Sequence, residues 1–141
     1  MKARPAQATR PPAAVQDAPM RSLAAQLKEF AFGLPDAYED FPWGESAAKV
    51  KGKVFVFFGR GADLDEKMML TVKLPVSGEG ILTLDFAEPT GYGLGRSGWV
   101  TVTCRAETEL PLELLREWVV ESYRAVAPKR SVARLDENMN G

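Results

Sequence analysis

The 141-residue sequence contains no histidine and a single cysteine, Cys104. The lack of histidine excludes Ser-His-Asp and Cys-His catalysis in their usual forms, as well as His-ligated zinc. One cysteine excludes an internal disulfide or a paired-cysteine site, and it fits a reducing compartment. We therefore expect a cytoplasmic, non-enzymatic protein with no catalytic residues, no metal site and no cofactor, in which Cys104 is buried at the end of a strand.

The sequence also lacks a long hydrophobic run and a charge imbalance. No apolar stretch approaches the roughly 20 residues needed to cross a bilayer, so we expect no membrane association. Lys and Arg number 18 against 19 Asp and Glu, so the overall charge of −1 predicts no affinity for nucleic acid. With 45% hydrophobic and 26% charged residues, the chain has the composition of one globular domain, which we expect to be monomeric.

The chain divides into three parts by composition. Residues 1–20 contain four prolines among Ala, Gln and Arg and are predicted to be a disordered leader. Residues 21–135 carry the apolar periodicities of a folded domain, and residues 136–141 are predicted to be a flexible tail. Four basic residues and one acidic residue lie in residues 1–21, so the folded part is acidic overall, which argues mildly against a broad DNA-binding surface.

Two helices are predicted to flank a set of strands. Leu23, Leu27, Phe30 and Leu34 recur at helical spacing after Ser22, and a second helix follows Pro111 and ends before Pro128, with a turn or two beyond it. β-prone or alternating segments predict strands at residues 37–41, 47–51, 53–58, 68–74 and 99–104. Residues 77–88 fit either a helix or a strand. Short connections favour an α+β fold, an antiparallel sheet with helices packed on one face.

Alternation within the strands predicts one basic face of the sheet. Lys49, Lys51 and Lys73 would share it with Thr71, Thr101 and Thr103 if the strands are regular. The simplest interpretation is a solvated face, because antiparallel sheets commonly expose one side to water. The functional alternative is a phosphate-binding platform with an aromatic side chain at its margin that stacks on a base. The candidates for that stacking are Trp43, Tyr92 and Trp99.

A glycine-rich segment, residues 89–98, contains a GxGxxG pattern between Gly93 and Gly98. A dinucleotide site needs a helix directly after these glycines, and here a strand is predicted instead. The favoured interpretation is a loop whose glycines permit positive φ. Tyr92, Arg96 and exposed amides leave a small anion site as the alternative.

Two polar clusters remain. Asp36, Glu39, Asp40 and Glu45 could act in acid–base chemistry or hold a cation, but nothing sets their spacing and a solvated acidic edge is favoured. Ser122 and Tyr123 fall on the inner stripe of the last predicted helix. A hydroxyl there is expected to bond to the sheet or to its own helix.

Several ordered blocks resemble the MmcQ/YjbR family. They are residues 34–44 (LPDAYEDFPWG), 49–55 (KVKGKVF), 72–74 (VKL), 89–100 (PTGYGLGRSGWV) and 121–123 (ESY). The similarity covers about residues 22–135, and its pattern positions here are Trp43, Lys49, Lys73, Trp99, Ser122 and Tyr123. The resemblance implies an α+β domain of double-wing type, like secretion chaperones or frataxin-type proteins. It also implies a predicted DNA-binding role, with no catalytic residues to carry over.

The leading hypothesis is a binding domain that contacts nucleic acid through Lys49, Lys51, Lys73 and Arg96. A protein-interaction module that uses a sheet edge or an apolar groove is the second hypothesis. A small-ligand protein or enzyme that uses the loop at residues 89–98 is the third.

Overall fold

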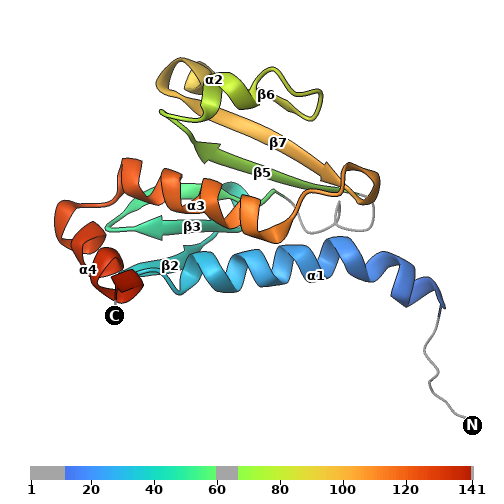
Figure 1. Cartoon of the computed structure of the whole chain (residues 1–141), viewed down its shortest axis with the longest axis horizontal. Helices are drawn as coiled ribbons and strands as arrows, with labels where there is room; N and C mark the ends of the chain where they lie inside the picture. Colours follow the sequence, from blue (N-terminus) through green and yellow to red (C-terminus); the bar gives the residue numbers. More distant parts are fainter. Residues whose placement is uncertain (1–11, 60–66, 141) are drawn as a thin grey trace, which may run out of the picture.

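A computed structural model describes residues 12–59 and 67–140 of the chain. The described residues form one six-stranded antiparallel sheet in the order β2-β3-β4-β5-β7-β6 (Figure 1). The strands are β2 (Ala37–Asp40), β3 (Ala47–Val50), β4 (Lys53–Phe57), β5 (Lys67–Lys73), β6 (Ala87–Pro89) and β7 (Trp99–Arg105). The helices are α1 (Pro12–Phe32), α2 (Gly78–Ile81), α3 (Leu112–Val126) and α4 (Lys129–Asn140), with 3₁₀ turns η1 (Pro42–Gly44), η3 (Leu94–Ser97) and η4 (Ala106–Thr108). The predicted α+β class is confirmed.

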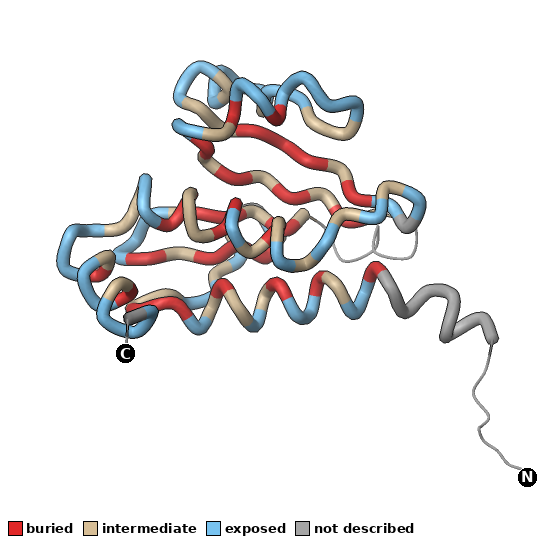
Figure 2. The backbone as a smooth tube through the Cα atoms, in the orientation of Figure 1, coloured by how far each residue is buried: buried red, intermediate tan, exposed pale blue. Residues whose placement is uncertain are grey.

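The helices α1 and α3 pack on the same face of the sheet. α1 contributes Met20, Ala24, Leu27 and Ala31, which recur every three or four residues along one side of the helix. α3 contributes Leu115, Trp118, Val119, Ser122 and Tyr123, all buried. The buried side chains of the strands form one cluster with these two stripes. Figure 2 marks the buried residues in red along the central strands and along one side of α1. One hydrophobic core therefore lies between the helices and one side of the sheet.

Burial alternates along β5 and defines the two faces of the sheet. Met68, Leu70 and Val72 are buried under the helices. Thr71 and Lys73 are half-buried and lie on the opposite face. β7 pairs with β5 over seven residues, and Val100, Val102 and Cys104 face the core. Burial raises the pKa of the Cys104 thiol to about 12, so this cysteine stays protonated at physiological pH.

The sheet is split at its centre. β4 and β5 pair through only Val56–Val72 and Phe57–Thr71. β3 and β4 pair with an irregularity: Ala48 is opposite Val56, but Lys49 is opposite Val54. Phe55 is the extra residue of this β-bulge, and its ring meets Tyr123 of α3 at 5.3 Å between centroids. The bulge sends Phe55 toward the helices while Phe57 points away from them.

Helix lengths differ most from the sequence predictions. α1 begins at Pro12 rather than near Ser22, so residues 12–20 of the predicted disordered leader are helical in the structure, and residues 1–11 lie outside the described residues. Three alanines among residues 12–20 favour a helix, and Pro12 stands in its first turn, where no N–H is needed. α4 likewise continues to Asn140 through most of the predicted flexible tail. The ambiguous segment 77–88 contains the short helix α2 and the strand β6.

Candidate functional site: the open face of the sheet

The candidate site is the face of the sheet opposite α1 and α3, here called the open face. The pairing register places on it one set of side chains from the six strands, and none of the described α-helices covers them. Its members are Tyr38, Asp40, Ala47, Lys49, Val54, Phe57, Lys67, Met69, Thr71, Lys73, Glu88, Trp99, Thr101, Thr103 and Arg105. The face combines aromatic, aliphatic, hydroxyl and basic groups with two carboxylates, Asp40 and Glu88.

Two aromatic rings meet on the open face. Phe57 of β4 and Trp99 of β7 meet across β5 with their centroids 5.9 Å apart and their planes tilted by 58°. Both side chains are half-buried, so part of each ring is accessible. A partly exposed aromatic pair on a sheet is a surface on which a planar ligand can stack.

Three threonine hydroxyls line up beside these rings. The Oγ1 of Thr101 lies 3.0 Å from that of Thr71 and 3.0 Å from that of Thr90. Each hydroxyl both donates and accepts, so the chain crosses β5, β7 and the loop after β6 without a charged group. This arrangement supplies hydrogen-bonding capacity next to the aromatic pair.

Cations stand at both ends of the β5–β7 pair. Lys73 is in register with Trp99 at one end, and Lys67 is in register with Arg105 at the other. Among the residues that the structure describes, none of these three cations forms an ion pair. Sequence analysis missed Lys67 and Arg105 because they lie one residue outside the predicted strands. Extending the alternation by one position at each end would have found them.

The structure does not gather the three predicted lysines into one patch. Lys49 lies on the open face, but its Nζ is 2.7 Å from the Asp40 carboxylate, which raises the pKa of the ammonium group. Asp40 is in turn held ionised, its pKa lowered by the hydrogen bond from Lys49. Lys49 therefore has a neutralising partner, and only Lys73 of the three remains on the open face without one in the described chain.

The prediction that Lys51 shares the strand face is wrong. Lys51 and Gly52 form the two-residue turn between β3 and β4, both with positive φ, 50° and 81°. Such a turn matches the twist of a hairpin and favours glycine at its second position. Lys51 consequently lies at the end of the hairpin, where its charge acts on Asp36 instead of on the sheet face.

The glycine-rich loop adjoins the open face at Lys73. Trp99 O accepts a hydrogen bond from Thr90 N, and Thr90 O accepts one from Gly95 N, which closes the loop on itself. A Cβ at Gly95 would lie 2.9 Å from the Cβ of Pro89, so no larger residue fits there. Tyr92, at φ 59°, is fully exposed at the tip, and Arg96 is exposed in η3. The strand β7 follows η3 at once, as predicted, so no helix is available to hold a pyrophosphate.

The stacking candidates occupy different positions. Trp99 lies on the open face at the start of β7, and Tyr92 is exposed in the loop that precedes this strand. The backbone of Trp43 belongs to η1 before β3, while its side chain lies outside the described residues. Trp99 is thus the predicted aromatic residue that the geometry brings next to Lys73.

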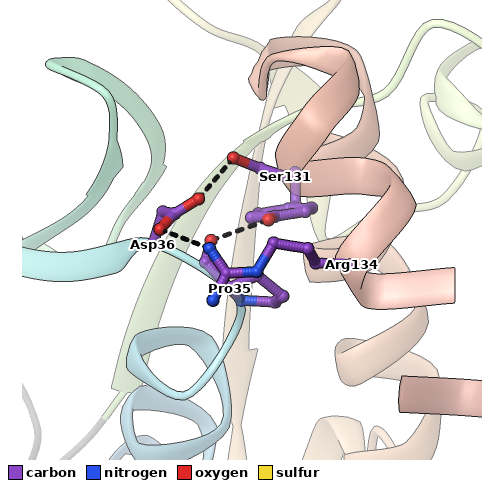
Figure 3. A network of polar contacts seen from close by, with 5 residues as sticks. Pro35, Asp36, Ser131 and Arg134 are labelled. Atoms are coloured by element: carbon purple, nitrogen blue, oxygen red, sulfur yellow. Dashed lines mark hydrogen bonds and ion pairs between the residues drawn. The ribbon is translucent and has the colours of Figure 1, made fainter. Parts of the chain in front are cut away.

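The acidic cluster is divided among structural contacts. Glu39 accepts a hydrogen bond from Ser46, Asp40 pairs with Lys49, and Asp36 accepts hydrogen bonds from Ser131 and Arg134 of α4 (Figure 3). Within residues 12–59 and 67–140, no group of three acidic or sulfur side chains is arranged to hold a metal ion. These carboxylates connect parts of the fold.

The contact between Asp36 and α4 predicts a specific response to acid. The hydrogen bond from Ser131, together with the charges of Arg134 and Lys51, lowers the pKa of Asp36 below its ordinary value of 3.8. Ionised Asp36 thus stabilises the fold above that value, and its contribution disappears as the pH falls through the lower folded-state pKa. We expect Asp36→Asn to lower the urea midpoint at neutral pH and to match the wild type in strong acid. Glu137→Gln, an exposed change on α4, is the control, and an equal deficit at both pH values would contradict the prediction.

Three consecutive residues of α3 connect distant segments through the backbone. Glu121 accepts hydrogen bonds from Val76 N and Ser77 N at 2.8 and 2.9 Å. Ser122 Oγ accepts one from Lys73 N at 2.8 Å and donates one to Phe55 O at 2.5 Å, so it bridges the split between β4 and β5. Tyr123 donates its phenol proton to Pro35 O at 2.7 Å. The expectation that the inward hydroxyls bond to the sheet is confirmed for Ser122, and the three residues have an architectural role.

Comparison with known families agrees with this architecture. The YjbR family model matches residues 32–125, about two thirds of the chain. The chain belongs to the YjbR family. The YjbR region contains all six strands and the Glu121-Ser122-Tyr123 segment, while most of α1 and the whole of α4 lie outside it. No curated protein matches the chain. None of the described helices is long and apolar enough to span a bilayer.

Proposed function

We propose that this YjbR family member is a non-enzymatic binding protein that takes a single-stranded nucleic acid on the open face of its sheet. The observation that supports the proposal most is the half-buried Phe57–Trp99 pair, which lies beside Lys73 at one end of β5–β7, with Lys67 and Arg105 at the other end. Aromatic rings stack on bases of any sequence, and the flanking cations neutralise phosphates.

The distribution of charge favours a narrow contact over a broad one. Lys49 is neutralised by Asp40, Lys51 lies in a turn, and Glu88 stands on the same face as Thr101. The cations without partners in the described chain follow the β5–β7 pair and continue to Arg96 in the adjoining loop. A single strand laid along this pair would meet Lys73 and the two rings near one end and Lys67 and Arg105 at the other, whereas a duplex needs a wider basic surface.

The test is a fluorescence-anisotropy titration of a labelled oligothymidylate at several salt concentrations. Each neutralised phosphate contributes about −0.7 to the slope of log K against log salt for a single strand. Lys73→Gln and Arg105→Gln should each make the slope shallower by about that amount, and Trp99→Leu should weaken binding by about 1–3 kcal/mol. Arg130→Gln on α4, which carries an exposed guanidinium, is the matched control and should change neither quantity.

Two results would overturn the proposal. One is the absence of binding at low salt, or a slope that Lys73→Gln and Arg105→Gln leave unchanged. The other is that the protein binds the matching duplex as tightly as the single strand and that Trp99→Leu does not change the affinity. Binding would then depend on phosphate contacts alone, without stacking on the rings.

A further inference from the structure

A groove between α2 and α3 lies on the helix-covered side of the sheet. It has a volume of about 470 Å³ and is lined by Ser77, Gly80, Ile81, Leu84, Leu114, Glu117, Trp118 and Glu121. Ile81 and Trp118 are nearly inaccessible, at 7% and 5% exposure, while Leu114 is half-buried and Leu84 is exposed. The groove therefore has an apolar floor and an apolar wall that faces solvent.

Residues 76–84, which form one side of this groove, expose several large apolar side chains. Val76, Leu82 and Leu84 are 84%, 36% and 41% exposed. Three of the eight exposed large hydrophobic side chains in the described chain thus fall within nine residues. Exposed apolar side chains gathered in one segment beside a groove are typical of a surface that another molecule covers.

The charged groups that line the groove or belong to the α2 segment beside it are acidic. Residues 75–85 contain Glu79 and Asp85 but no Lys or Arg, and Glu117 and Glu121 of α3 line the groove itself. Within the described part of the chain, Glu79, Asp85 and Glu117 have no ion-pair partner. An occupant of this surface must bring apolar side chains for the floor and positive charges for the rim.

The groove is held in place before any occupant arrives. Glu121 accepts hydrogen bonds from the backbone of Val76 and Ser77, and its other oxygen accepts one from Ser77 Oγ at 2.6 Å. These contacts fix the start of α2 against α3. A preformed groove loses little entropy when it binds, so the apolar contact is available for affinity.

We propose that the α2–α3 groove docks a basic amphipathic helix of a partner protein. The apolar residues of that helix, spaced at i, i+3, i+4 and i+7, would lie over Ile81, Leu84 and Trp118, and its Lys and Arg residues would face Glu79 and Glu117. Helix-in-groove recognition uses this combination of an apolar floor and a charged rim. The surface is separate from the open face, so the inference does not depend on the proposed nucleic-acid function.

The test uses a fluorescein-labelled synthetic helix of leucine and lysine with leucine at those spacings. We expect it to bind the full-length protein, and we expect a peptide of the same composition in scrambled order, without an apolar face, to bind at least about tenfold more weakly. Glu117→Lys, which places a like charge at the rim, should weaken binding about tenfold. Leu84→Ser should weaken it severalfold, while Glu137→Lys on α4 should leave it unchanged.

Three outcomes would overturn the inference. The first is no preference for the amphipathic over the scrambled peptide. The second is an affinity that neither Glu117→Lys nor Leu84→Ser changes, although circular dichroism shows both variants folded. The third is a dimer in sedimentation equilibrium that Leu84→Ser dissociates, which would assign the surface to a second copy of the chain. Trp99→Leu should not affect peptide binding, so failure here and failure of the nucleic-acid proposal can be distinguished.

Discussion

Replacement of Ser122 by alanine is expected to lower the free energy of unfolding by about 2–4 kcal/mol. The Ser122 hydroxyl accepts a hydrogen bond from Lys73 N and donates one to Phe55 O, where β4 and β5 have separated too far to pair with each other. Alanine removes both bonds and leaves two backbone groups of the sheet without partners. A buried, unsatisfied backbone group costs about 1–3 kcal/mol, and most domains are stable by only about 5–15 kcal/mol.

Ser131→Ala is the matched control for this prediction. Ser131 is also buried, but its hydroxyl donates to the Asp36 carboxylate, which keeps Arg134 as a second partner. Urea unfolding followed by circular dichroism should show a clearly larger loss for Ser122→Ala, and hydrogen exchange should show faster exchange of the Lys73 amide. Equal losses for the two variants would contradict the bridging role of Ser122.

The sequence was sufficient where burial alternates regularly. Leu70 and Val72 alternate with Thr71 and Lys73, so the faces of β5 were predicted correctly. The stripe of α3 from Leu115 to Tyr123 was predicted for the same reason, because its apolar residues recur at helical spacing. The α+β class follows from these two signals together, and Thr71 and Lys73 were placed on the correct face of β5.

Periodicity failed where the chain departs from a regular element. Lys53–Phe58 is apolar at nearly every position, so nothing in the segment indicates that the bulge turns Phe55 and Phe57 to opposite faces. Lys51 was assigned to a strand because alternation alone does not show where a hairpin turn begins. The neutralisation of Lys49 by Asp40 depends on the register between β2 and β3, which is a tertiary property. The candidate site was therefore predicted in outline, and its composition came from the structure.

The position of the bulge leads to the largest expected change in stability. Phe55 is inaccessible to solvent, and its ring meets the buried ring of Tyr123 edge-on, at 83° between planes. Phe55→Ala would leave a cavity between β4 and α3 and remove this aromatic contact, at a cost of about 3–5 kcal/mol. Phe55 also supplies the carbonyl oxygen that accepts the Ser122 hydrogen bond. The cavity would therefore form where β4 and β5 are joined by only two residue pairs, so we expect the sheet to have little capacity to compensate.

Phe41→Ala supplies the same chemical change at an exposed position. Phe41 is 57% exposed, so its replacement should alter the free energy of unfolding by no more than about 0.5 kcal/mol. Urea titrations of both variants give the comparison, and Phe55→Leu should fall between them because it refills part of the cavity. If Phe55→Ala were as stable as Phe41→Ala, Phe55 would not point into the core. The β4 bulge would then be absent, and Phe57 would lose its place beside Trp99 on the open face.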